Sequence, residues 1–135
     1  MKLITRDTDY AIRAICYIAR QKQRIVTVAE LVKELRIPYP FLRKILQALN
    51  KRKILRSYKG RGGGFELSVV SNKIFLVDLM EVFQGTLTLN ECFLKRLACP
   101  NIKICPLRKK LKNIESYVFK QLRSITIASL LKIRN

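Results

Sequence analysis

Three closely spaced cysteines are the residues of this chain whose type and spacing most directly indicate chemistry. Cys92, Cys99 and Cys105 are separated by six and five residues, and Pro100 and Pro106 directly follow two of them. Thiolates in a loop can hold zinc or an iron–sulfur cluster, and they are also the reacting groups of redox switches. The spacing matches neither the short knuckles of structural zinc sites nor the common ferredoxin patterns. The sequence therefore predicts a metal or redox site here, with iron–sulfur and zinc both open.

The surroundings of these cysteines favour reactive thiolates over structural disulfides. Six lysines and arginines lie between positions 95 and 110, and positive charge favours the thiolate form.

The sequence shows no secretory or membrane-spanning segment. Charged residues already occur within the first seven positions, and charged residues interrupt every apolar stretch before it reaches the length of a membrane span. We therefore expect a cytoplasmic protein with no membrane partner, in which thiols stay reduced. Cys16 falls on an apolar helical stripe, so we expect it to be a small buried hydrophobic residue.

The complete absence of histidine narrows the remaining chemistry. It excludes Cys–His and Ser–His catalytic pairs, and it excludes histidine-ligated zinc or haem. The 9 acidic residues are scattered, so no acid–base pair can be identified. We therefore expect neither an enzyme nor a small-molecule substrate.

The net charge makes a polyanion the expected partner. Lysine and arginine total 28 against 9 acidic residues, which gives a formal charge of +19. Because 49% of the 135 residues are hydrophobic, the chain is long and apolar enough to bury a core and is not a disordered basic tail. Nucleic acid is the first candidate and an anionic membrane surface the second. A basic RNA-binding or ribosome-associated structural protein also fits this charge.

Helical periodicity predicts the elements that position these groups. One apolar stripe runs along residues 5–20, and a capping box at Thr27 and Glu30 begins a short second helix. A third helix from about Pro40 to Lys51 buries leucines on one face. A cationic helix after a short helix and a tight turn is typical of a helix-turn-helix recognition element. The polar face of the third helix carries Tyr39, Arg43, Lys44, Gln47 and Lys51.

A glycine-rich hairpin is predicted directly after the recognition helix. Residues 54–58 and 65–69 have strand character, and residues 59–64 form a basic tip between them. Glycine lets the backbone approach DNA closely, and cations at such a tip reach phosphates or a narrow minor groove. A flexible loop is the alternative, but the position after a cationic helix favours a DNA-binding wing. Its contact residues would be Lys59, Gly60 and Arg61.

The C-terminal half predicts a dimer. A fourth helix is expected at residues 77–84. A further helix of about 18 residues begins at Leu107, and its apolar residues have coiled-coil-like spacing. In a monomer this apolar stripe would be exposed to water, so we expect it to pack against a second subunit. Thr126 is expected to cap a short last helix. The predicted fold is mainly α with a small β-hairpin wing, a winged helix-turn-helix plus a long C-terminal dimerisation helix. Its predicted parts are a DNA-binding domain (1–84), a cysteine-bearing loop (85–106) and the dimerisation and C-terminal helices (107–135).

In their order and spacing, these motifs resemble the IscR/NsrR-type family of bacterial winged-helix regulators. They are residues 8–14 (TDYAIRA), 37–42 (IPYPFL) and 60–65 (GRGGGF), followed by the three cysteines before a long helix. The similarity covers nearly the whole chain. It implies a dimeric transcription regulator, expected to be a repressor, that reads a palindromic operator in double-stranded DNA. The third helix would enter the major groove, with Arg43 at a base-reading position, and the wing would enter the adjacent minor groove.

The resemblance also implies an iron–sulfur cluster, [2Fe-2S] or [4Fe-4S], that changes operator affinity and is bound by Cys92, Cys99 and Cys105. IscR-like proteins use a histidine three residues after the last cysteine, where this chain has Arg108. In the NsrR branch, an acidic residue from helix one of the other subunit can complete the site, and Asp9 matches that position. Asp9 equally suits a first-turn carboxylate favoured by the helix dipole. The implied signal is nitric oxide, redox state or iron–sulfur supply, and a cluster-free thiol switch of the same fold is the alternative.

Overall fold

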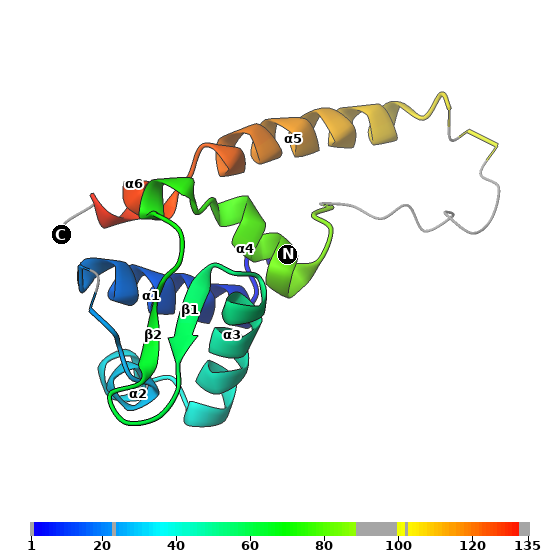
Figure 1. The fold of residues 1–135 in the computed structure, drawn as a ribbon. Coiled ribbons are helices and arrows are strands. Elements are labelled where there is room, and N and C mark those ends of the chain that lie inside the picture. Colours follow the sequence, from blue (N-terminus) through cyan, green and yellow to red (C-terminus); the bar gives the residue numbers. More distant parts are fainter. Residues whose placement is uncertain (1, 23, 89–99, 102, 133–135) are drawn as a thin grey trace.

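A computed structural model describes residues 2–22, 24–88, 100–101 and 103–132 (Figure 1). The hairpin and the shorter helices form a body, and one long helix extends away from it. This mainly α fold with a small antiparallel hairpin confirms the predicted fold class. The elements within the described residues are α1 (Arg6–Arg20), α2 (Val28–Leu35), α3 (Tyr39–Lys51), β1 (Leu55–Tyr58), β2 (Gly64–Leu67), the 3₁₀ helix η1 (Ser71–Lys73), α4 (Leu76–Gln84), α5 (Pro106–Arg123) and α6 (Ile127–Leu131).

The main core forms where the apolar stripes of the first three helices meet. Ile15 on α1, Leu31 on α2 and Leu46 on α3 are each completely buried. Threonine caps start the first two helices, because the hydroxyl of Thr5 accepts from the N–H of Thr8 and that of Thr27 accepts from the N–H of Glu30. Such caps satisfy backbone donors that a helix start otherwise leaves unpaired. The spacing read from the sequence thus matches the observed helices closely.

The hairpin is joined to the helices through an isolated β-bridge between Val26 and Phe65. In the β1–β2 pair, Leu55 lies opposite Leu67 and Tyr58 opposite Gly64. On the other side of β2, Val26 and Phe65 exchange two backbone hydrogen bonds, both of 2.8 Å. The hairpin is therefore attached to the segment between α1 and α2, and its position relative to those helices is fixed by the backbone.

The last helix returns to the main core. The N–H of Ile127 donates to the carbonyl of Ile74 at 2.9 Å, and the N–H of Leu76 donates to the carbonyl of Ile125 at 3.0 Å. Ile127 is completely buried in the same core as α1 to α3. Thr126 caps this helix, as predicted from the sequence. The chain therefore leaves the body after α4 and comes back to it at α6.

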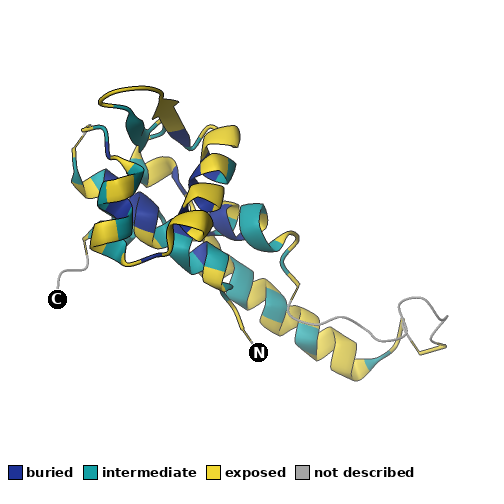
Figure 2. Cartoon of the chain, turned by 90° about the horizontal axis from the view of Figure 1, so that it is seen from below, coloured by how far each residue is buried: buried dark blue, intermediate teal, exposed yellow. Residues whose placement is uncertain are grey.

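The two ends of α5 have different surroundings. Leu122, near its C-terminal end, is buried in a second small cluster with Met80 of α4. Towards the other end Leu107, Ile114 and Tyr117 are between 54% and 66% exposed. Figure 2 shows exposed residues along this outer part and buried residues concentrated in the body. Among the described helices, none combines the length and apolar character needed to cross a membrane.

Candidate nucleic-acid interface

The outer face of α3 carries every side chain predicted to contact DNA from this helix. Leu42, Leu46 and Leu49 have no exposed surface, which anchors one side of the helix in the core. The opposite side is free: all five predicted contact residues are exposed, and they are Tyr39, Arg43, Lys44, Gln47 and Lys51. The helix therefore presents a cationic and hydrogen-bonding edge to its surroundings, with its backbone held from behind.

A tight turn sets the angle between α2 and α3. Arg36 has a left-handed backbone (φ 55°), and its N–H donates to the carbonyl of Val32. Ile37 is 2% exposed and anchors the turn, and Pro38 precedes α3 in an extended conformation. The guanidinium of Arg36 is exposed in this turn. Arg36 is not among the residues predicted from the sequence, although a cation immediately before the Ile–Pro helix break could have indicated it.

An acidic side chain holds α2 against α1. The carboxylate of Glu30 accepts a hydrogen bond from the hydroxyl of Tyr17 at 2.8 Å and one from Nη1 of Arg24 at 3.0 Å. Hydrogen bonding by Arg24, and then by Tyr17, lowers the pKa of the Glu30 carboxyl. The same hydrogen bond to Glu30 raises the pKa of Tyr17. The capping pattern at Thr27 predicted α2 correctly, but Glu30 uses its carboxylate to connect helices.

The tip of the hairpin needs its glycines for two different reasons. Gly60 and Gly62 have positive φ values of 86° and 73°, which glycine adopts without strain. Gly63 and Gly64 instead lie against backbone, because a Cβ on Gly64 would be 2.3 Å from the carbonyl oxygen of Val26. The three predicted wing contacts are all exposed, and they are Lys59, Gly60 and Arg61.

A charged group that sequence analysis missed lies on the outer face of the hairpin. Arg56 and Glu66 are cross-strand partners, with Nη1 and Oε1 3.7 Å apart. The hydroxyl of Tyr58, two residues along β1, donates to the same carboxylate oxygen. Hydrogen bonding with Tyr58, and then the charge of Glu66, raise the pKa of Arg56. Only the strand register brings these three residues together, so their positions in the sequence gave no signal.

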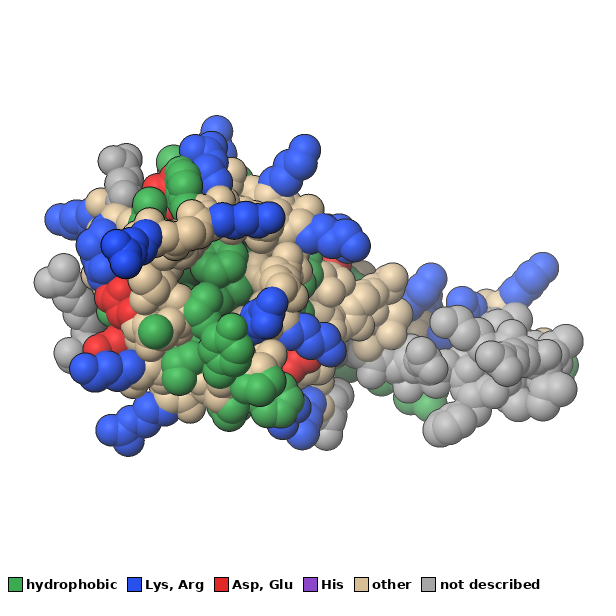
Figure 3. Space-filling view, turned by 60° about the horizontal axis from the view of Figure 1, so that its bottom comes forward, with side chains coloured by type: hydrophobic (Ala, Val, Ile, Leu, Met, Phe, Trp, Pro, Cys, Tyr) green, Lys and Arg blue, Asp and Glu red, His purple; other side chains and the backbone are tan. Residues whose placement is uncertain are grey.

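The helix edge and the wing tip lie on one side of the molecule. Figure 1 shows the hairpin tip, α2 and the start of α3 at the same end of the body. Figure 3 views this end and shows lysine and arginine side chains around a central region of hydrophobic ones. Tyr39 and Phe41 are 50% and 41% exposed, and the guanidinium of Arg6 lies 4.7 Å from the centre of the Phe41 ring. Such a basic face with exposed aromatic groups suits a phosphate backbone and base edges.

Asp9 lies in the first turn of α1, where sequence analysis expected a carboxylate. Its Oδ2 is 3.0 Å from Nε of Arg13, one helical turn later, and both side chains are about half exposed. The position therefore has a partner within its own chain. A ligand role for Asp9 towards a second subunit stays a prediction.

The predicted cysteine ligands are described only in part. Cys92 and Cys99 lie outside the described residues. Cys105 is half-buried immediately before α5, beside a hollow of about 440 Å³ that is lined by Lys103, Arg108, Lys109 and Lys112. Cys16 is 9% exposed in the main core, and burial raises the pKa of its thiol. The prediction that Cys16 is a buried hydrophobic residue is thus confirmed, whereas the ligand set stays a prediction.

A buried helical core, an exposed cationic third helix and a glycine-tipped hairpin beside it define a winged helix-turn-helix DNA-binding protein. Comparison with known families identifies it further. Residues 4–133 match the Rrf2 family, described as iron-dependent transcriptional regulators, and the chain belongs to this family.

Known relatives and structures agree with this assignment. The chain is 33% identical over 134 residues to a putative HTH-type transcriptional regulator of Aquifex aeolicus, covering 97% of this chain and 93% of that protein. It is 28% identical over 130 residues to the HTH-type transcriptional regulator NsrR of Halalkalibacterium halodurans, covering 95% and 89%. Among solved structures, CymR, the global cysteine regulator of B. subtilis, superposes with a TM-score of 0.83 at 18% identity over all of both chains. The predicted likeness to IscR/NsrR-type regulators is confirmed, and the chain is a DNA-binding transcriptional regulator.

Proposed function

We propose that this Rrf2-family regulator is a homodimeric repressor that reads a palindromic operator with α3 and the wing of each subunit. The observation that carries the proposal is that the exposed edge of α3 and the glycine tip lie on one basic side of the body. A helix of this kind fits the major groove, and a hairpin beside it reaches the neighbouring minor groove. Arg43, near the middle of the exposed edge, is the proposed base-reading residue.

The remaining cations of this face are proposed to bind phosphates. Lys44 and Lys51 flank the base-reading edge of α3, and Lys59 and Arg61 extend from the wing. Each phosphate contact releases counterions, so removing one lowers the log–log salt slope of operator binding by about 0.9. Because the proposed dimer carries two wings, we expect Arg61→Gln to reduce the slope by about 1.8. Lys110→Gln, an exposed α5 lysine away from this face, is the matched control and should leave the slope unchanged.

The outer part of α5 supports the proposed dimer. Leu107, Ile114 and Tyr117 are exposed on a helix whose other end is packed in its own chain. A second copy would remove these side chains from water, which favours association. Sedimentation equilibrium should give twice the chain mass. Ile114→Lys should shift the protein towards monomer, whereas Lys112→Gln on the same helix should not.

An iron–sulfur cluster bound by Cys92, Cys99 and Cys105 is the proposed sensor, with Asp9 of the partner subunit as fourth ligand. The described part of this donor set fits such a group: Cys105 is partly accessible, and four cationic side chains line the hollow beside it, which suits the negative charge of a thiolate-ligated cluster. Asp9 is half exposed, so its carboxylate is accessible once it leaves Arg13. Bound there, the cluster would supply thiolate-ligated iron that reacts with nitric oxide or oxidants. The protein residues would convert its loss into a change at the dimer contact.

A thiol switch on the same fold is the second candidate. It is favoured by the position of Cys105, which is partly exposed at the start of a helix among lysines and arginines, so that an oxidant can reach its thiol. The likeness to CymR supports the fold of this alternative, not its chemistry.

Anaerobic purification separates the two candidates. The cluster proposal expects a brown protein with charge-transfer absorption and about stoichiometric iron, together with loss of operator binding when nitric oxide is added. Cys105→Ser should lose the colour, and Cys16→Ser, a buried cysteine outside the site, should keep it. A colourless protein with free thiols, whose operator affinity changes on mild oxidation, would support the switch and overturn the cluster.

A further inference from the structure

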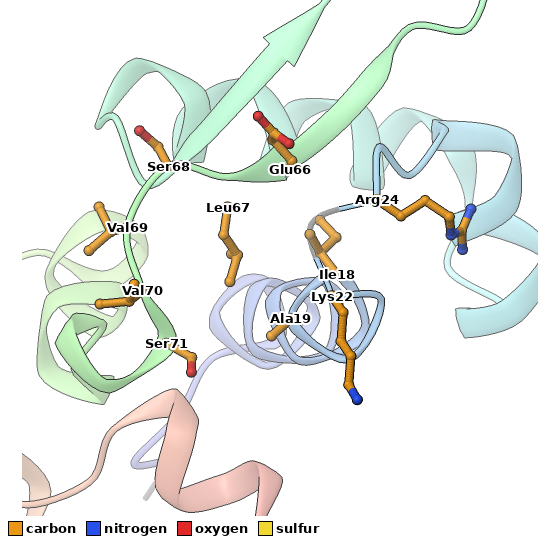
Figure 4. A pocket seen from close by; sticks show the side chains of 10 residues that line it. All are labelled: Ile18, Ala19, Lys22, Arg24, Glu66, Leu67, Ser68, Val69, Val70 and Ser71. Carbon is orange, nitrogen blue, oxygen red and sulfur yellow. The ribbon is translucent and has the colours of Figure 1, made fainter.

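A groove between the end of α1 and the strand that leaves the wing has the dimensions of a small-molecule site. Its volume is about 570 Å³, within the ~300–1,000 Å³ typical of ligand pockets. Figure 4 shows Leu67 of β2 projecting towards α1, which contributes Ile18 and Ala19 to the lining. Val69 and Val70 line it from the segment after β2. These five apolar residues form one part of the lining, and the other five lining residues are polar or charged.

Of the charged side chains at the rim of the groove, Lys22 is the one that is available to bind an anionic ligand. The guanidinium of Arg24 is held by both oxygens of Glu30, and Figure 4 shows it pointing away from the groove. Glu66 accepts a hydrogen bond from Tyr58, and its carboxylate also points away. Lys22 is exposed and forms no ion pair with any residue that the structure describes. The unbalanced charge next to the groove is therefore positive.

A hydroxyl accompanies this ammonium group. Lys22 and Ser71 extend towards the same side of the groove, from its two different walls (Figure 4). The Ser71 side chain has no hydrogen-bond partner within the described part of the chain. An ammonium and a hydroxyl are both donors that a carboxylate can accept from. The apolar lining behind them suits a hydrocarbon body.

We propose that this groove binds a small organic carboxylate with an apolar body, and that the bound acid tightens operator binding. Lys22 and Ser71 donate hydrogen bonds to the carboxylate, and the apolar part of the ligand lies between Ala19 and Leu67. Because the acid then contacts both α1 and β2, it adds to the Val26–Phe65 backbone pairing that already attaches the wing to the helices. Local separation of the wing from the helices then becomes less favourable, and this is the proposed route by which the acid tightens operator binding. Acid binding itself is independent of the proposed function, whereas the effect on the operator rests on it.

Hexanoate and hexylammonium test the binding step, because they share a chain and differ in charge. Each is titrated into the full-length ¹⁵N-labelled protein without DNA. We expect hexanoate to shift amide signals of residues 18–22 and 67–71, with an apparent Kd on the order of 1 mM for so small a ligand in an open groove. Hexylammonium should cause little change there. Equal shifts by both probes, or shifts elsewhere only, would overturn the proposed site.

Two variants locate the acid within the groove. Lys22→Gln removes a charge-assisted hydrogen bond and should weaken hexanoate binding about tenfold. Lys33→Gln, an exposed lysine on α2, is the matched control and should have no effect. Ala19→Trp should fill the groove and abolish binding, and if this variant does not fold, the two lysine variants decide. Equal hexanoate affinities for both lysine variants would contradict the assignment.

The effect on DNA is measured separately. Saturating hexanoate should tighten operator binding by about fivefold in the parent and not in Lys22→Gln. Because the proposed dimer has two grooves, operator should tighten hexanoate binding at each groove by about the square root of this factor, roughly twofold. Hexanoate binding with unchanged operator affinity would overturn the coupling and leave the binding site. Hexanoate binding to a protein that binds no DNA would instead mark a failure of the proposed function.

Discussion

Thr8 and Gln84 are 76 positions apart in the sequence, and Oγ1 of Thr8 donates a hydrogen bond of 2.7 Å to Oε1 of Gln84. The same carboxamide accepts from the N–H of Thr5 and donates to the carbonyl of Leu3, both at 3.1 Å. Thr8 has no exposed surface, and within the described residues it is the one polar side chain that is buried. Gln84 therefore joins the start of α1 to the end of α4.

Thr8→Val tests this connection while keeping the shape of the side chain. Losing the buried donor should lower the free energy of unfolding by about 1–3 kcal/mol, as measured by urea denaturation. Thr86→Val, at an exposed position just after α4, should change it by less than about 0.5 kcal/mol. Equal stabilities of the two variants would show that the hydrogen bond contributes little.

Gly64→Ala and Gly62→Ala compare two glycines of the wing. A Cβ on Gly64 meets the carbonyl of Val26, whereas one on Gly62 meets nothing within 4 Å. Gly62→Ala should cost about 1 kcal/mol for its positive φ. Gly64→Ala should cost more, because it must also separate the strand from Val26, and should weaken operator binding. Hydrogen exchange of the Phe65 amide reports that separation, and protection equal to that of the parent would contradict the prediction.

Glu30 gives the molecule a pH-dependent contribution to stability. Its pKa is lowered in the folded state by Arg24 and Tyr17, so the contribution is full above the ordinary carboxyl pKa and is lost as pH falls through the lower folded value. Glu30→Gln should therefore be less stable than the parent at pH 7. The difference should shrink as pH is lowered from about 5 to 2.

Glu34→Gln is the control for this titration. Glu34 is exposed on the same helix and forms no ion pair with a described residue. Urea denaturation of the three proteins across this pH range makes the comparison. A Glu30→Gln deficit that stays constant with pH would mean that the carboxylate charge is not its source.

Arg43→Ala tests base reading by α3. Truncation should cost about 1–3 kcal/mol of operator affinity in each half-site and relax selectivity at one base pair of each. Lys44→Ala, on the same exposed edge, should instead weaken binding to all sequences alike. Competition with a set of single-base operator variants separates these outcomes. An unchanged sequence preference in Arg43→Ala would remove it from the base-reading role.

The sequence predicted the helices well because each buries a periodic apolar stripe. The buried positions Ile15, Leu31 and Leu46 lie on the stripes read from spacing alone. The third helix begins at Tyr39, one residue before the expected start at about Pro40. Local signals also gave the caps at Thr27 and Thr126. These features depend on residues within a few positions of one another.

Contacts between distant segments were not predictable in this way. The pairing of Val26 with Phe65 and of Phe75 with Thr126 depends on how whole elements are arranged. The same is true of the Arg56–Glu66 pair, which requires the strand register. For the candidate site, residue type and spacing were enough to select the exposed edge of α3. They did not select Arg36 or the groove beside Lys22, because both depend on tertiary geometry.

The return of α6 to the body gives the outer part of α5 a mechanical role. The C-terminal end of α5 and the residues after it are held to the body at neighbouring points, because Leu122 packs with Met80, Ile127 is buried in the core with α1, and residues 74–76 pair with residues 125–127. If α5 were followed by an unattached tail, a rotation of α5 would not be transmitted to the body. A segment clamped at two neighbouring points acts as a lever, and torque applied along α5 reaches α1 through the residues that bury Ile127.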